Sequence, residues 1–222
     1  GTFLVGLIAL VISVPISVGI ALFVTEVAPR RTRKPIIYAV DLLAAIPSVV
    51  YGLWAFAALR QPLADWYDSI SSATSGIPLL NKLTADPSTT GLSYMTAGII
   101  VAIMITPIIT SVTRETFATV PRAQKDGAFA LGATRWEMIR IAVIPYARSG
   151  VIGGAILGLA RAVGETLAVT LVIGNRAALP QTVFSPTYTM ASVIANQFQE
   201  ASGETQRAAL LEVALVLLVM TF

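Results

Sequence analysis

The chain has 222 residues, of which 55% are hydrophobic and only 12% are charged. That charged share is about half of what soluble proteins carry. Its 15 basic and 12 acidic residues leave a formal net charge of only +3, which predicts no nucleic-acid-binding surface. The chain contains no cysteine and no histidine, which excludes disulfides, Cys/His metal sites and catalysis by an imidazole or a thiolate. The composition therefore predicts a membrane protein rather than a soluble globule, and we expect no catalytic residues, metal ligands or cofactor in it.

Five apolar stretches are candidates for transmembrane helices, at residues 2–24, 36–59, 94–112, 150–174 and 208–222. A helix needs about 20 residues to cross a hydrocarbon core of about 30 Å, and the last stretch is shorter than that. We expect the chain to be truncated at both ends, because it enters the first stretch at Gly1 and stops while still apolar. One further helix upstream gives an expected six spans, with both ends in the cytoplasm.

Prolines lie inside the first three apolar stretches, at Pro15, Pro47 and Pro107, and they predict kinks. Nearby hydroxyl side chains, such as Ser48 and Thr106, have two interpretations. They either line a pathway or bond the backbone groups that proline leaves free.

Basic residues are concentrated in two of the four connecting loops. The first and third loops carry Arg30, Arg31, Arg33, Lys34, Arg114, Arg122, Lys125, Arg135, Arg140 and Arg148. The second and fourth loops carry only Arg60, Lys82, Arg176 and Arg207. By the positive-inside rule, the first and third loops are expected in the cytoplasm. The stretch at 2–24 then runs inward, and the stretch at 150–174 runs outward.

The third loop has its own predicted structure. Residues 122–131 favour a helix, Gly132 allows the backbone to turn, and Thr134 with Glu137 three residues later forms a capping box for a second helix. The second helix exposes Trp136 beside Arg135, a combination that suits a protein partner at the membrane surface. The alternative is that Trp136 anchors the helix at the depth of the lipid headgroups.

The same loop resembles the EAA loop of ABC-importer permeases. The resemblance lies in the spacing of three groups: an acid with two small residues, then a glycine, then a hydrophobic residue followed by proline. In this chain they are Asp126-Gly127-Ala128, Gly132 and Ile144-Pro145. In that family, this loop forms the coupling helices that sit in a groove of the ATPase subunit. The resemblance implies ATPase-coupling roles for Asp126, Gly127, Ala128, Gly132, Arg135, Trp136 and Pro145.

Three longer motifs resemble the phosphate-specific ABC permeases, of the PstC rather than the PstA type. They are AIPSVVYGLW at 45–54, LGATRWE at 131–137 and RAVGETLAV at 161–169, and ASVIAN at 191–196 fits as well. The similarity covers nearly the whole chain. It implies an all-α, type I (MetI-like) permease bundle, with residues 1–222 as one transmembrane permease domain and residues 114–148 as the cytoplasmic coupling loop.

The resemblance also implies partners and a location. It implies a multi-pass subunit of the prokaryotic inner or plasma membrane, in contact with lipid and with inorganic phosphate. This subunit pairs with a PstA-type permease, a dimeric PstB-type ATPase that hydrolyses ATP inside, and a PstS-type phosphate-binding protein outside. The chain itself contains no Gly-rich loop ending in Gly-Lys-Ser/Thr, so ATP is expected to bind elsewhere.

The stretch at 150–174 supports this reading independently. As one continuous helix, it places Gly150, Gly154, Gly158, Arg161 and Glu165 within a stripe of about 80°. The glycines predict close approach of another helix. Arg161 then lies about 16 Å along the helix from Gly150, near the middle of the membrane.

Arg161 requires compensation, because an arginine at that depth costs about 2.5 to 3.5 kcal/mol on insertion scales. One interpretation is an ion pair with Glu165, four residues on, that neutralises both charges. We favour the other, in which the planar donor fork of Arg161 binds phosphate oxygens. Glu165 then holds Arg161 while the pathway is empty.

Three other functions remain open at this stage. An ABC permease for another oxyanion or small solute keeps the coupling loop but does not require Arg161. An ion-coupled secondary transporter could use Arg161 and Glu165 for exchange. An intramembrane hydrolase fits least, because no base is available to a serine.

Overall fold

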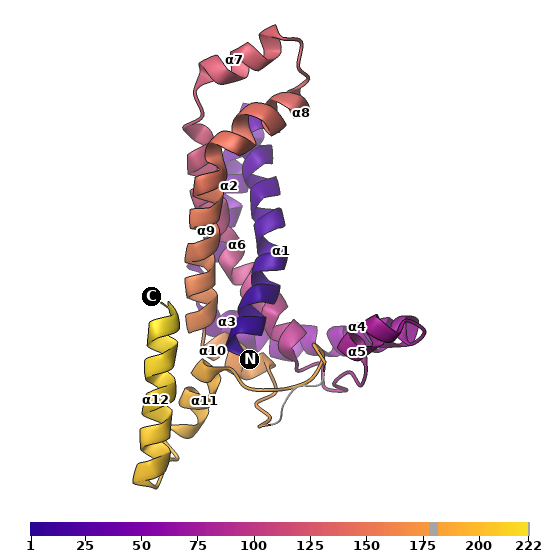
Figure 1. The fold of residues 1–222 in the computed structure, drawn as a ribbon, viewed down its shortest axis with the longest axis vertical. Helices are drawn as coiled ribbons and strands as arrows, with labels where there is room; N and C mark the ends of the chain where they lie inside the picture. The colour runs from indigo at the N-terminus through magenta and orange to yellow at the C-terminus, as the bar shows by residue number, and fades with distance from the viewer. Residues whose placement is uncertain (178–181, 222) are drawn as a thin grey trace. The chain divides into compact units, whose positions relative to one another are not determined.

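The computed structural model describes residues 1–177 and 182–221, and its regular structure is helical (Figure 1). An isolated bridge between Gly174 and Thr187 is the only β pairing among these described residues. The predicted all-α class is therefore confirmed. The chain divides into two compact units, which we describe separately. Unit 1 comprises Gly1–Ala9, Ile46–Met104 and Ala160–Phe222, and unit 2 comprises Leu10–Ala45 and Ile105–Leu159.

Three helical segments are long and apolar enough to cross a membrane. The first is α1 (Thr2–Leu22) with its continuation η1 (Phe23–Val27), and the second is α6 (Tyr94–Ala118). The third runs from Arg135 to Gly164 through α8 (Arg135–Met138), η3 (Ile139–Val143) and α9 (Ile144–Gly164). The predictions of spans at 2–24 and 94–112 are confirmed.

The predicted span at 36–59 is interrupted. Helix α2 (Arg30–Ala45) ends before Pro47, whose ψ of 141° is extended. The chain then continues through α3 (Ser48–Trp54), η2 (Ala55–Leu59) and α4 (Arg60–Thr74). Proline cannot donate the helical hydrogen bond and disfavours helix at the residue before it, so the expected kink is a full break. This segment is at most a broken fourth span.

The C-terminal part also departs from the predicted spans. Helix α9 ends at Gly164, and the short α10 (Leu167–Val172) follows, so 150–174 is not one helix. Residues 190–197 form α11 (Met190–Gln197), which begins with a capping box of Thr189 and Ser192. Helix α12 (Glu204–Thr221) covers the fifth predicted span. It includes three charged residues and is not among the three clear spans. Phe222, the last residue of that prediction, lies outside the described residues.

Within unit 2, the glycines of α9 pack against α6, as the stripe predicts. A methyl group at Gly158 would meet the side chain of Ile109 at 2.7 Å, and one at Gly154 would meet Val112 at 3.4 Å. At Gly153, off the stripe, nothing lies within 4 Å. Without a glycine at 158, the two helices could not approach this closely.

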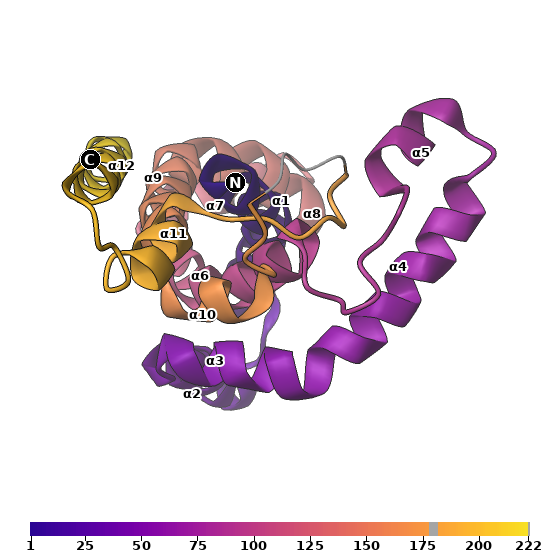
Figure 2. The ribbon, with the colours of Figure 1, turned by 90° about the horizontal axis from the view of Figure 1, so that it is seen from below.

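Within unit 1, α3 lies beside α10 (Figure 2). Tyr67 of α4 is fully buried and stacks on Phe184, with ring centroids 4.3 Å apart. Its hydroxyl shares a 2.9 Å hydrogen bond with that of Thr96 at the start of α6. The segment after α10 is held as well, because the amide of Met95 donates to the carbonyl oxygen of Val183 at 3.1 Å. These contacts hold this part of unit 1 together, where α4 and α5 (Pro78–Thr84) also lie.

Candidate functional site

The loop between α6 and α9 has the predicted helix-turn-helix form. Helix α7 (Arg122–Ala130) ends in a Schellman motif, in which the amide of Ala133 donates to the carbonyl of Ala128 at 3.1 Å. The amide of Gly132 donates to the carbonyl of Phe129 at 2.9 Å. Gly132 has a φ of +82°, a left-handed conformation that favours glycine. The turn therefore requires glycine because of this backbone conformation. A methyl group added there would meet no neighbouring atom within 4 Å.

The second helix of this loop begins with the predicted capping box. The carboxylate of Glu137 accepts a 2.7 Å hydrogen bond from the amide of Thr134. The hydroxyl of Thr134 accepts one from the amide of Glu137 at 3.4 Å. Together they satisfy two donors at the start of α8 and fix where Arg135 and Trp136 begin the helix.

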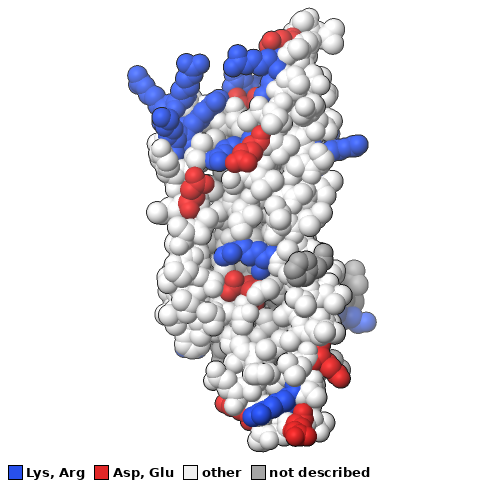
Figure 3. All heavy atoms as spheres, turned by 90° about the vertical axis from the view of Figure 1, so that its left-hand side faces the viewer, with Lys and Arg blue, Asp and Glu red and all other residues white. Residues whose placement is uncertain are grey.

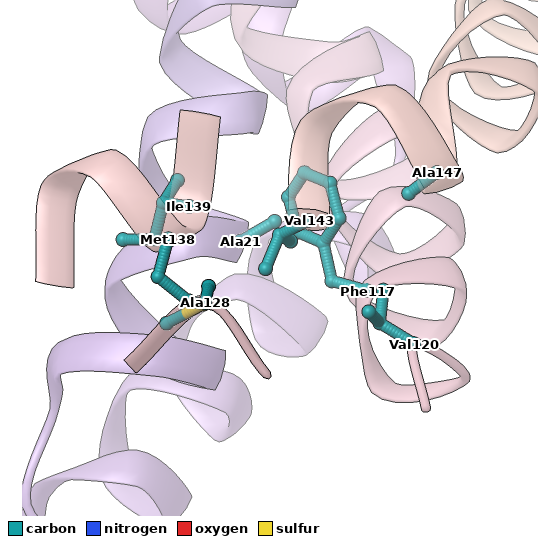
Figure 4. Close-up of a cluster of buried hydrophobic side chains, with 8 residues drawn as sticks. All are labelled: Ala21, Phe117, Val120, Ala128, Met138, Ile139, Val143 and Ala147. Carbon is teal, nitrogen blue, oxygen red and sulfur yellow. The ribbon is translucent and has the colours of Figure 1, made fainter. Parts of the chain in front are cut away.

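An apolar cluster holds the loop against the rest of unit 2 (Figure 4). It consists of Ala21, Phe117, Val120, Ala128, Met138, Ile139, Val143 and Ala147, which come from α1, α6, the turn after α6, α7, α8, η3 and α9. Ala128 is therefore buried inside the unit. Of the predicted coupling residues, it supports the loop rather than presenting a surface to a partner.

The other predicted coupling residues are exposed: Asp126, Gly127, Gly132, Arg135, Trp136 and Pro145. Trp136 is 62% exposed, and Leu131, which we did not predict, is 89% exposed. An open groove between α7 and the segment formed by η3 and the start of α9 is lined by Gln124, Ala128, Leu131, Ile141, Ala142, Pro145 and Tyr146. Basic side chains gather at this end of unit 2 (Figure 3). The loop thus presents large apolar groups among positive charges.

The second candidate site, at Arg161 and Glu165, differs from its prediction. Helix α9 ends at Gly164, so Glu165 is not on the same helical stripe as Arg161. The Glu165 carboxylate accepts a 3.3 Å hydrogen bond from the amide of Ala168 in α10. No Arg161–Glu165 ion pair within 4 Å occurs in the described part of the chain. The pairing inferred from a four-residue spacing is therefore wrong for this structure, because the helix breaks between the two residues.

Arg161 is exposed and lies in the last turn of α9. Its guanidinium makes no hydrogen bond or ion pair with the described residues. The carbonyl groups at a helix C-terminus favour a cation there, which offsets part of its cost in a membrane. Among the described residues, Arg161 is thus exposed and unpaired.

The segment that follows Arg161 is fixed by α3. A methyl group at Gly52 of α3 would lie 2.9 Å from the Cα atom of Ala168 and 2.8 Å from the side chain of Leu171. Because the Cα atom of Ala168 belongs to the backbone, it cannot move aside as the end of a flexible side chain could. Two of the three sequence motifs that carried the family resemblance, at 45–54 and 161–169, therefore pack directly on each other. Sequence reasoning did not predict this contact.

These features define a class: a polytopic helical membrane protein with a two-helix loop between spans. The model of the family described as "Binding-protein-dependent transport system inner membrane component" matches residues 3–222. The chain belongs to this family of ABC-transporter inner-membrane components, and is a multi-pass membrane protein.

Individual relatives match along the whole chain. It is 46% identical to the phosphate transport system permease protein PstC of Mesorhizobium japonicum and 47% identical to that of Xylella fastidiosa, and spans 68% of each. It is 43% identical to PstC 2 of Mycobacterium tuberculosis, again over all of this chain and 68% of the relative.

A solved structure shares the fold. A chain from inward facing conformations of the MetNI methionine ABC transporter matches with a TM-score of 0.62. The match covers 99% of this chain and 85% of that one, at 17% identity. It confirms the predicted MetI-like permease fold and carries no information on substrate.

Proposed function

We infer that this chain is a transmembrane permease subunit of an ATP-driven phosphate importer and forms half of the phosphate pathway. Relatives at 43 to 47% identity, matched over the whole chain, are named phosphate transport system permease proteins. The family is defined by inner membrane components of binding-protein-dependent transport systems. The chain itself is no enzyme in this proposal, and ATP hydrolysis belongs to a partner subunit.

The observation that carries the proposed pathway is the state of Arg161. An arginine in the last turn of an apolar helix is exposed and has no partner among the described residues. Its planar fork of donors matches two oxygens of a phosphate. In this role, Arg161 lowers the cost of moving an anion through the apolar region. Glu165 acts less directly, because its carboxylate caps α10 and repels an anion.

The proposed coupling surface is the loop at 114–148, which includes α7 and α8. Trp136 and Leu131 supply most of its exposed apolar area, and the exposed Arg135 directly precedes Trp136. Such a surface suits a protein partner, since buried aromatic groups contribute much of the energy of protein interfaces. The partner we propose is a dimeric PstB-type ATPase in the cytoplasm. A PstA-type permease completes the pathway, and a PstS-type protein delivers phosphate from outside.

The test is uptake by vesicles that contain the full-length subunit and its three partners. Labelled phosphate, sulfate and molybdate are offered in parallel. Each is tested with and without ATP on the side of the membrane where the ATPase is bound. We expect phosphate to accumulate only with ATP and to be preferred over both competitors. A preference for sulfate or molybdate would reject the substrate, and uptake without ATP would reject the energy source.

A further inference from the structure

The end of the first span is tied to the coupling loop by a charge pair. In η1, the carboxylate of Glu26 lies 2.5 Å from the ammonium group of Lys125 in α7. Only 9% of the Glu26 side chain and 20% of the Lys125 side chain are exposed. This is the sole ion pair within 4 Å in residues 1–177 and 182–221. Both residues belong to unit 2, and they are 99 positions apart in the chain.

Two further cations bind the same short segment. The guanidinium of Arg135, in α8, donates to the carbonyl oxygen of Glu26 at 3.3 Å. Arg33, in α2, donates to the carbonyl oxygens of Thr25 at 2.9 Å and of Ala28 at 3.0 Å. The segment therefore receives one cation from each of α7, α8 and α2. Both helices of the coupling loop reach the end of α1 in this way.

A carboxylate at this position is not explained by stability of the helix alone. The C-terminal end of a helix carries partial negative charge, so an acid in its last turn is unfavourable unless a cation compensates it. Burial adds a cost, because a partly desolvated pair gains little net stability over a neutral, well-packed pair. What the pair does provide is a specific link, since Lys125 directly precedes Asp126 on α7.

We propose that Glu26 is a positioning residue for coupling, and that its bond to Lys125 transmits displacement of α7 to the first span, α1. The proposal rests on the function inferred above, in which α7 and α8 contact the ATPase. The apolar contact of Ala21 with the same cluster as Ala128 holds the two segments together. The ion pair adds a link that depends on direction and distance. A movement of α7 toward or away from η1 is then transmitted to the membrane-spanning helix α1.

The experiment compares phosphate import with ATP hydrolysis in the same vesicles, using the complete transporter. In Glu26→Gln and in Lys125→Gln, we expect phosphate imported per ATP hydrolysed to fall about tenfold, an effect typical of coupled residues in contact. Co-purification of the ATPase should stay normal. A charge swap, Glu26→Lys with Lys125→Glu, should restore at least about half of the wild-type ratio, because it rebuilds the pair with the cation at the helix C-terminus.

Matched controls separate this link from general effects of charge. Lys34→Gln and Asp41→Asn remove exposed charges of unit 2 that form no ion pair with described residues, and the ratio should not change. If Glu26→Gln fails to accumulate in membranes, Lys125→Gln at the more exposed partner decides the question, with Lys125→Arg as the variant that keeps the charge.

Wild-type vesicles separate failure of the Glu26–Lys125 link from failure of the proposed function. If wild-type vesicles do not import phosphate with ATP, the proposed function fails, and the link loses its basis. If wild type imports phosphate but Glu26→Gln keeps the wild-type ratio of import to hydrolysis, the link is overturned. It is likewise overturned if the single variants lose the ratio and the charge swap restores none of it.

Discussion

The coupling loop and the segment around Arg161 satisfy their polar groups in opposite ways. In the loop, Gly132, Thr134 and Glu137 make local bonds, and Lys125 finds a partner in Glu26. At the end of α9, Arg161 has no partner in the described part of the chain. These polar groups of the loop are therefore satisfied within this subunit, whereas Arg161 remains for a ligand or partner outside it. Substitutions in the coupling loop and around Arg161 test this difference.

The largest effect is expected at Arg161. Replacing it in Arg161→Gln removes the positive charge offered to the anion, and ATP-dependent phosphate uptake should fall to near background. Arg176→Gln is the matched control, because Arg176 is also exposed and its guanidinium makes no bond to the described residues. The control should transport phosphate normally. Equal loss in both variants at equal abundance would mean that overall charge matters, not the position.

A nearly complete loss is expected when the turn of the coupling loop is changed. Gly132→Val forces a β-branched residue into a positive φ, which costs about 1 to 2 kcal/mol or more and displaces α8 with Trp136. Uptake should be abolished while membrane insertion persists, because the spans are unchanged. Gly153→Ala, in α9 with nothing within 4 Å of the added methyl group, should transport normally. Normal ATPase docking and stimulation in Gly132→Val would contradict the coupling role.

An intermediate effect is expected where α3 meets α10. Gly52→Ala introduces a methyl group 2.9 Å from the backbone of Ala168. Overpacking of this kind costs about 1 to 3 kcal/mol. Thermal unfolding of the purified complex should therefore shift to a lower temperature, with reduced uptake. Gly19→Ala in α1, where nothing lies within 4 Å, should leave the unfolding temperature unchanged or raise it slightly. An unchanged temperature in Gly52→Ala would mean that this contact is not tight.

The smallest effect is expected at the cap of α8. Thr134→Ala removes one side of the capping box and should cost about 1 kcal/mol. Because the apolar cluster around Met138 still holds the loop, we expect uptake to decrease only a few-fold. Thr134→Ser keeps the hydroxyl and should restore wild-type uptake. Complete loss in Thr134→Ala would show that the cap, rather than the cluster, determines the loop.

Local signals explain which features could be predicted from the sequence. The capping box of Thr134 and Glu137 and the turn at Gly132 depend on residues within a few positions, so a reader of the sequence can identify them. The glycine stripe of α9 is similar, because its period follows from one helix. Long apolar stretches likewise predicted α1 and α6.

Features that depend on distant residues could not be predicted. The stretch 150–174 is apolar enough to be predicted as one helix, yet α9 ends at Gly164 and the separate helix α10 packs on α3. The break of α2 before Pro47 was expected only as a kink. The bond of Lys125 to Glu26 joins residues 99 positions apart, and no local pattern signals it. Hydrophobicity indicates that a segment is buried in lipid or protein, but not where its helix ends.

In the proposed pathway, Arg161 binds the transported anion and does not merely neutralise the charge of Glu165. Phosphate uptake by vesicles with the double variant Arg161→Gln and Glu165→Gln tests it most directly, with uptake normalised to the amount of complex in the membrane. If Arg161 served only to balance Glu165, removing both charges would leave a neutral pair that is cheaper to bury, and transport would return. We predict no rescue of the Arg161→Gln defect, and a milder defect in Glu165→Gln alone. Near-normal uptake in the double variant would contradict the proposed role of Arg161 in the pathway.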